Sequence, residues 1–222
     1  MIDANELIDC HFLGKQMNSM VLERRKNAFS VVLNEQTIWI TGGHASGHPG
    51  AMIHDNHEFE DIEDRFTSAK STTQFITYGE PSVEGPELPF KIFGHTMVKV
   101  NKTVYIIGGF SNPDPTLRAW AQTCNKSWVF DLTNFDIKPG PSLNEGRSEH
   151  SSSTMKINGK LFIVVAGGRI ANDYGPDHNH HGKHGKKYQL NSVELLDTEY
   201  PHKGWIIGDY LIQLPELNYL NN

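Results

Sequence analysis

The chain has 222 residues, of which 37% are hydrophobic and 21% charged, and it contains 20 Gly and 11 Pro. This composition is typical of a globular, turn-rich protein with a sizeable core, and it excludes a disordered chain. The formal net charge of -6 argues against binding along nucleic-acid phosphates, which needs an excess of cations.

The cysteines and the first residues bear on the compartment. Cys10 and Cys124 are too few for a disulfide framework and too far apart for a CxxC metal site, so we expect free thiols. No apolar run approaches the ~18 residues that span a bilayer, and residues 1–10 carry acids in place of the basic start of a signal peptide. These features favour a cytoplasmic protein, with an extracellular one as the alternative if a signal peptide is missing from this chain.

A strand, a turn containing Asn and a second strand that ends in Gly-Gly recur along the chain. The matching segments are LNEQTIWITGG at 33–43, VNKTVYIIGG at 100–109 and INGKLFIVVAGG at 157–168. Asn tolerates the left-handed backbone of tight turns, and the second strands are rich in β-branched and aromatic residues. Each segment therefore predicts a β-hairpin, with second strands at 37–41, 103–107 and 161–165. At the glycine doublets we expect that a side chain would collide with neighbouring backbone or forbid the torsion.

The repeat divides the chain into four parts in order. Residues 1–26 are expected to form the third and fourth strands of a preceding sheet. One full unit covers 27–90 with a long loop at 44–72, the next covers 91–146, and the last covers 147–222 with a His-rich loop at 169–191. The third strands are marked by Asp9, Asp131 and Asp197, with Ile76 as the counterpart in the first full unit.

The insertions always fall between the second and third strands, so they must emerge on one face. In a repeat array, the face that carries such insertions is usually the binding face. We expect 44–72 and 169–191 to be poorly ordered and on the same face. The partner-contact candidates there are Arg118, Trp120, Arg169 and Tyr174, because Arg, Trp and Tyr dominate hot spots.

This pattern resembles the kelch repeat over nearly the whole chain, with Trp205 in the fourth strand of the last unit. The second unit has Phe135 or Ile137 in that slot. The resemblance implies an all-β fold, a kelch-type β-propeller made as an incomplete arc of four-stranded antiparallel blades. It also implies a protein-binding scaffold whose loops on one face hold a partner.

Two functional alternatives stay open beside the scaffold. One is an extracellular or secreted kelch propeller, in which the sequons at Asn101 and Asn125 would carry glycans. The other is a copper enzyme like galactose oxidase, but no matching Tyr/His pattern surrounds Cys10 or Cys124. We therefore expect no enzyme, no cofactor, no nucleic-acid or membrane partner, and a protein partner that the sequence does not name.

Histidines cluster in two of the insertions. The first insertion holds His44, His48, His54 and His57 before an acidic run, and the last holds His178, His180, His181 and His184 among lysines. Imidazoles and carboxylates suit divalent metals, but neither insertion has a fixed ligand spacing, and the lysines oppose a cation. The expectation is solvated loops without a metal site.

Some polar residues recur at fixed places before the hairpins. His95 matches His150 and Arg25 matches Arg147. Catalysis would explain one such residue and not a periodic set, so these predict scaffold contacts.

The small number of repeat units predicts that the first and last sheets each have one face exposed to water. A propeller needs about four to eight blades to close, so an open arc leaves apolar faces in water. We expect either a piece of a larger protein, which is favoured, or self-association of two copies through open blade edges. The isolated chain should not be a stable monomer.

Overall fold

The computed structural model describes residues 25–44, 69–111, 122–171 and 187–208. Within these ranges the regular structure is β-strand, apart from one short 3-10 helix, η1 (Pro201–Lys203). No helix in them has the length and apolarity that a membrane crossing requires. The chain divides into two compact units, Met1–Phe93 (unit 1) and Gly94–Asn222 (unit 2).

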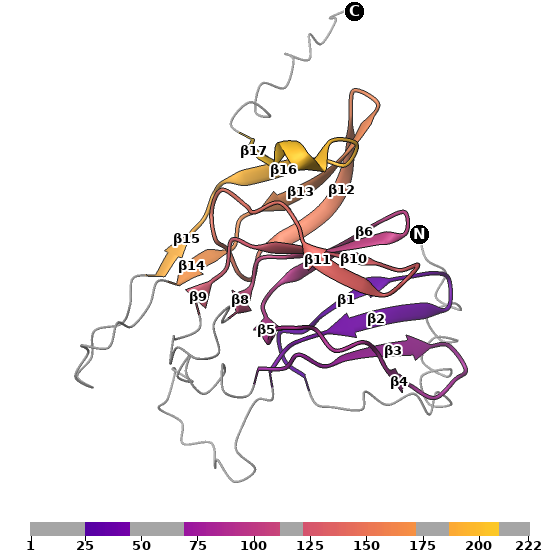
Figure 1. Cartoon of the computed structure of the whole chain (residues 1–222). Helices are drawn as coiled ribbons and strands as arrows, with labels where there is room; N and C mark the ends of the chain where they lie inside the picture. The colour runs from indigo at the N-terminus through magenta and orange to yellow at the C-terminus, as the bar shows by residue number, and fades with distance from the viewer. Residues whose placement is uncertain (1–24, 45–68, 112–121, 172–186, 209–222) are drawn as a thin grey trace, which may run out of the picture. The chain divides into compact units, whose positions relative to one another are not determined.

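The described residues of unit 1 form a four-stranded antiparallel sheet, called sheet 1 (Figure 1). Its strands lie in chain order: β1 (Phe29–Val32), β2 (Thr37–Thr41), β3 (Thr73–Thr77) and β4 (Val83–Glu84). The short strand β5 (Ile92–Phe93) ends the unit. Trp39 in β2 is fully buried and stacks on Phe75 in β3, with the ring centroids 6.1 Å apart.

In unit 2, the part of the chain that the structure describes contains two further four-stranded antiparallel sheets (Figure 1). Sheet 2 consists of β6 (Thr96–Val100), β7 (Thr103–Ile107), β10 (Ser127–Asp131) and β11 (Asp136–Pro139). Sheet 3 consists of β12 (Ser151–Ile157), β13 (Lys160–Ala166), β16 (Val193–Asp197) and β17 (Trp205–Ile207). Two short antiparallel pairs accompany them: β8 (Phe110–Ser111) with β9 (Gln122–Thr123), and β14 (Arg169–Ala171) with β15 (Lys187–Gln189).

The predicted second strands are confirmed as β2, β7 and most of β13, each in its own sheet. Their alignment also corrects one landmark. Thr77 pairs with Thr37 as Asp131 pairs with Thr103, so Thr77 and not Ile76 is the first-sheet counterpart of Asp131.

The hairpin turns use Asn in two different ways. Asn101 and Asn158 adopt the predicted left-handed backbone, with φ of 55° and 50°. In the longer first turn, the Asn34 side chain instead accepts a hydrogen bond from Gln36 N at 2.9 Å. Its role there is an Asx-type turn, which does not need positive φ.

The glycine doublets repeat one backbone geometry, as predicted. The first glycines have φ of 57°, 61° and 64°, and the second have φ of 89°, 88° and 91°. A Cβ added at Gly108 would lie 2.5 Å from Arg147 O, and one at Gly168 would lie 2.7 Å from Ser148 O. The left-handed torsion therefore favours glycine, and the close approach of backbone leaves no room for a side chain.

The core of unit 2 lies between sheets 2 and 3. Alternation along the strands gives each sheet two faces. We call the face of a sheet that is on the side of the following repeat its trailing face, and the opposite face its leading face. The trailing face of sheet 2 carries Val98, Val100, Tyr105, Ile107 and Val129. The leading face of sheet 3 carries Leu161, Ile163, Val165, Leu196 and Trp205. These two faces form one hydrophobic cluster, in which β6 and β12 are in contact.

Trp205 joins the two sheets of unit 2. Its side chain is 7% exposed, and Nε1 donates to Pro141 O at 2.9 Å. Trp205 pairs with Leu196 as Ile137 pairs with Phe130, so Ile137 holds the same register in sheet 2. Phe135 does not fill that slot, because it lies in the turn before β11 and is 55% exposed.

We expect Trp205→Phe to lower the free energy of unfolding by about 1–2 kcal/mol, because it removes the bond to Pro141 and part of the buried ring. Urea unfolding followed by circular dichroism measures the change. Phe135→Leu is the control and should change stability by less than about 0.5 kcal/mol, since its ring is mostly exposed. Equal losses in the two variants would contradict the assignment of Trp205 as the inter-sheet contact.

Candidate functional site

The insertions predicted to carry the binding face start and end in short strand pairs. In unit 2, β8 and β9 flank the segment 112–121, and β14 and β15 flank the segment 172–186. Strand β14 contacts β9, so the bases of both insertions lie side by side. The predicted loop 169–191 is thus shorter than expected, since its first and last parts are strands.

Arg169 is the partner-contact candidate that the described residues include. It lies at the start of β14, and its side chain is 23% exposed. Its guanidinium pairs with Glu149 and lies over the Phe110 ring, 5.7 Å from the centroid. These contacts hold the charged group at the base of the insertion and leave part of it accessible to a partner.

The other partner candidates, Arg118, Trp120 and Tyr174, lie outside the described residues. The same holds for the order of the insertions and for the histidines of the last one: His178, His180, His181 and His184. Those expectations remain predictions.

His44 corrects one sequence expectation. The sequence predicts that His44 begins a solvated loop, but its side chain is 1% exposed and meets the Phe93 ring edge-on at 5.2 Å. The reason is that its backbone still pairs with Lys26 on one side and with Ala69 on the other. His44 is therefore a buried residue of unit 1.

The described residues offer no obvious metal chemistry. No group of three or more His, Cys, Asp or Glu side chains among them could hold a metal ion. Cys124 is a free, buried cysteine, and burial raises the pKa of its thiol, which disfavours the thiolate that binds metals.

The two sequons differ in their surroundings. Asn101 is exposed in the turn between β6 and β7. Asn125 is half-buried, and its side-chain amide donates to Leu143 O at 3.3 Å. A glycan would therefore fit the turn at Asn101 and would break a structural contact at Asn125.

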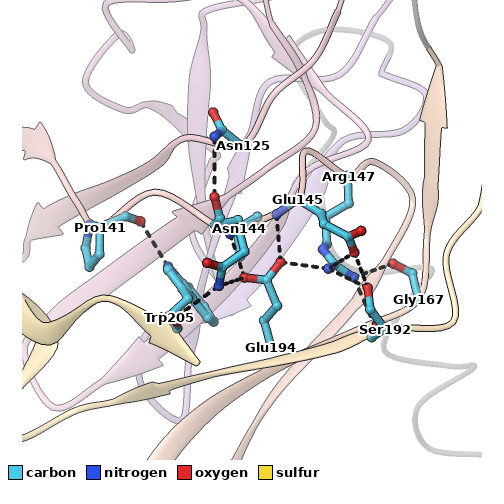
Figure 2. A network of polar contacts seen from close by, with 10 residues as sticks. Asn125, Pro141, Asn144, Glu145, Arg147, Gly167, Ser192, Glu194 and Trp205 are labelled. Carbon is cyan, nitrogen blue, oxygen red and sulfur yellow. Dashed lines mark hydrogen bonds and ion pairs between the residues drawn. The ribbon is translucent and has the colours of Figure 1, made fainter. Parts of the chain in front are cut away.

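Arg147 and Glu194 form a buried ion pair in unit 2 (Figure 2). Arg147 Nη2 lies 2.8 Å from Glu194 Oε1, and both side chains are 0% exposed. Arg147 precedes β12, whereas Glu194 lies within the apolar strand β16. Such a pair is stable only if the remaining donors and acceptors are also bonded.

The Glu194 carboxylate is saturated by the segment that precedes sheet 3. Asn144 donates to Oε2 through its backbone N at 2.7 Å and through Nδ2 at 2.9 Å. Glu145 N donates to Oε1 at 3.1 Å. Asn144 Nδ2 also donates to Trp205 O at 3.0 Å, so the network reaches the inter-sheet tryptophan (Figure 2).

The Arg147 guanidinium bonds to the residue that follows β13 and to the residue that precedes β16. Nη1 donates to Gly167 O at 2.9 Å and to Ser192 O at 3.2 Å, and Nη2 donates to Ser192 Oγ at 3.0 Å. Ser192 Oγ in turn donates to Glu145. Arg147 thus fixes the base from which residues 172–186 extend.

Arg25 repeats this role in unit 1. Its Nη1 donates to Gly42 O at 2.7 Å and to Thr72 O at 2.9 Å, and its Nη2 donates to Thr72 Oγ1 at 2.8 Å. Gly42 and Thr72 match Gly167 and Ser192 in the repeat. The prediction that Arg25 and Arg147 make scaffold contacts is confirmed.

His95 and His150 are also buried, as scaffold residues should be. They are 2% and 7% exposed, and His150 Nε2 lies 2.8 Å from Thr96 Oγ1. Burial lowers the pKa of His95 to about 3, with the charge of His150 as a second cause. Burial likewise lowers the pKa of His150 to about 3, followed by the effect of Arg147. Both imidazoles are neutral at pH 7.

Glu194 and Asn144 are residues that the sequence patterns did not single out. The signal for Glu194 was present, because a carboxylate in the middle of Val-Glu-Leu-Leu must either face water or find a partner. For Asn144 no local signal exists, since its partners lie in β16 and β17.

Comparisons with known proteins agree with this architecture. No family model matches the chain. Kelch-like protein 40 of Xenopus laevis is 32% identical over 93 residues, which make up 40% of this chain and 14% of that protein. The structure of YjhT aligns with a TM-score of 0.58 and 16% identity, covering 81% of this chain and 55% of that one. The chain therefore spans only part of the length of both.

The repeated four-stranded antiparallel sheets and the likeness to YjhT define an all-β protein of the β-propeller class, in which the described sheets are blades of an incomplete propeller. The likeness to Kelch-like protein 40, which covers 40% of this chain, supports the resemblance to the kelch repeat that the sequence shows.

Proposed function

We propose that the chain is a protein-binding scaffold that holds its partner through the insertions of its kelch repeats. The observation that carries the proposal is the contact between β9 and β14, which brings the bases of segments 112–121 and 172–186 together in unit 2. In this proposal the chain has no catalytic activity and needs no cofactor. The likeness to a kelch-like protein supports it.

Arg169 is the proposed anchor among the described residues. It is partly exposed, and its guanidinium is held by Glu149 and Phe110. A charged group that is already held in place loses little side-chain entropy when it binds. Arg side chains are also enriched among residues that dominate interfaces.

The test compares captured proteins between matched variants of the full chain. In one variant a short Gly-Ser linker replaces residues 172–186, and in another Arg169 becomes Ala. The control is Lys102→Ala, in the exposed turn at the opposite end of β7. Quantitative mass spectrometry of proteins retained from a cell extract should find a set that the unmodified chain and the control share.

We expect the linker variant to lose that set, and Arg169→Ala to weaken it by about 5- to 30-fold, the effect of a 1–2 kcal/mol anchor. Circular dichroism establishes that each variant is folded. If the same proteins bind all variants equally, the insertions of unit 2 are not the binding surface.

A further inference from the structure

Sheet 3 has an apolar trailing face opposite the face that packs on sheet 2. By strand register this face carries Ser153, Met155, Phe162, Val164, Leu195 and Ile206. Met155 is 49% exposed and Ile206 is 54% exposed. Apolar side chains on both edge strands of this face are thus in contact with water, whereas Leu195 between them is 6% exposed.

The repeat shows what kind of surface fits this face. The equivalent positions in sheet 2 form its trailing face, which is covered by the leading face of the next sheet. In that interface β6 lies against β12. The surface that fits the trailing face of sheet 3 is therefore the leading face of another sheet of this type, with its first strand against β12.

The amide of the second glycine in each doublet also indicates that, among the described residues, a following repeat is missing after sheet 3. Gly43 N donates to Ile92 O at 2.8 Å, and Gly109 N donates to Arg147 O at 2.8 Å. In each case the second glycine of a doublet binds the segment that opens the following repeat. The equivalent amide of Gly168 has no hydrogen-bond partner among the residues that the structure describes.

Sheet 1 supplies a leading face with the required properties. By register, that face carries Val32, Ile38, Ile40 and Ile76. Val32 in β1 is 63% exposed, and the three isoleucines are half-buried. Arg25 precedes sheet 1 at the position that Arg147 holds before sheet 3, so the segment that would reach Gly168 is present as well.

We propose that the trailing face of sheet 3 binds the leading face of sheet 1 in a second copy of this chain. Strand β1 of one copy lies against β12 of the other, which brings Val32 to the side of Met155. The backbone segment at Arg25 of the second copy accepts the Gly168 amide. Repeated reciprocally about a two-fold axis, the contact gives a closed dimer.

Light scattering coupled to size exclusion tests the association with the full chain. We expect a species of twice the 25.0 kDa chain mass, which dissociates on dilution. Ile206→Lys, on the trailing face, should raise the dissociation constant at least about tenfold, because the contact would bury a charge. Ile207→Lys is the matched control: it is the next residue of β17, is 42% exposed and faces the other way, and it should remain dimeric.

Photo-cross-linking identifies the occupant of the face even if a variant misfolds. A benzoylphenylalanine at position 155 is irradiated in an equal mixture of ordinary and ¹⁵N-labelled chains. Cross-links between differently labelled copies, mapped to β1 or β2, support the proposal. Cross-links within one copy, to residues 1–24 or 209–222, would overturn it, as would a monomer at all concentrations or equal dissociation of the Ile206 and Ile207 variants.

Discussion

Arg147→Met is expected to lower the free energy of unfolding by about 3–5 kcal/mol, the largest effect of a single substitution that this structure predicts. Arg147 and Glu194 are both 0% exposed, so removing the guanidinium leaves a carboxylate in the protein interior without its charged partner. It also removes the donor to Gly167 O, whereas Ser192 O keeps its hydrogen bond from Gly167 N. Methionine fills a similar volume, so the loss reports on charge and hydrogen bonding more than on packing.

Two controls separate the charge from the backbone contacts. Arg25 makes the equivalent bonds to Gly42 and Thr72, but the position that matches Glu194 in sheet 1 holds the neutral Gln74. Arg25→Met should therefore cost less, about 1–2 kcal/mol, because no buried carboxylate is created. Glu194→Gln added to Arg147→Met should recover part of the loss by removing the unpaired charge.

Urea unfolding at one fixed protein concentration gives these differences, since association would make stability depend on concentration. A double-mutant cycle of Arg147→Met and Glu194→Gln should show a coupling of about 1–3 kcal/mol. If Arg147→Met and Arg25→Met lower the free energy of unfolding equally, or if the cycle shows no coupling, the ion pair does not stabilise the contact between Arg147 and sheet 3.

The hairpins could be predicted because their signals are local. In VNKTVYIIGG the turn residue, the strand composition and the terminating glycines all lie within ten neighbouring positions, and β7 begins and ends where the sequence places it. The glycine doublets were predictable for the same reason: they end each repeated strand, and the left-handed torsion they adopt favours glycine. Repetition then strengthened each signal, because Gly43, Gly109 and Gly168 share one backbone torsion.

The contacts of the candidate site could be predicted only in part. Periodicity identified Arg25, Arg147, His95 and His150 as scaffold residues, and their burial or bonding confirms it. It did not identify their partners, because Glu194 and Asn144 are brought together from different strands and segments by the packing of sheet 3. The burial of His44 could not be predicted, because its polarity suggests solvent, whereas its backbone pairing with Ala69 and its contact with Phe93 arise only in the folded chain.

The second large effect is expected in acid. Burial lowers the pKa of both His95 and His150 from 6.5 to about 3, so the unfolded chain binds protons below pH 6.5 that the folded chain excludes. Stability from these residues is therefore fully present above pH 6.5 and falls as the pH drops towards 3. When the pH is lowered from 7 to 5, each histidine should lower the free energy of unfolding by about 2 kcal/mol and the pair by about 4 kcal/mol. This is a large share of a typical domain's stability.

His95→Gln isolates this contribution, because the variant lacks one titrating group and keeps every carboxylate. Its free energy of unfolding should fall by about 2 kcal/mol less than that of the unmodified chain when the pH is lowered from 7 to 5. His150→Gln should behave alike, and Gln can still bond to Thr96 Oγ1, which His150 meets at 2.8 Å. Urea unfolding at both pH values measures the difference. Because the carboxylates cancel in the comparison, identical pH dependence in variant and unmodified chain would mean that these imidazoles are protonated in the folded protein, and the packing described around them would then be wrong.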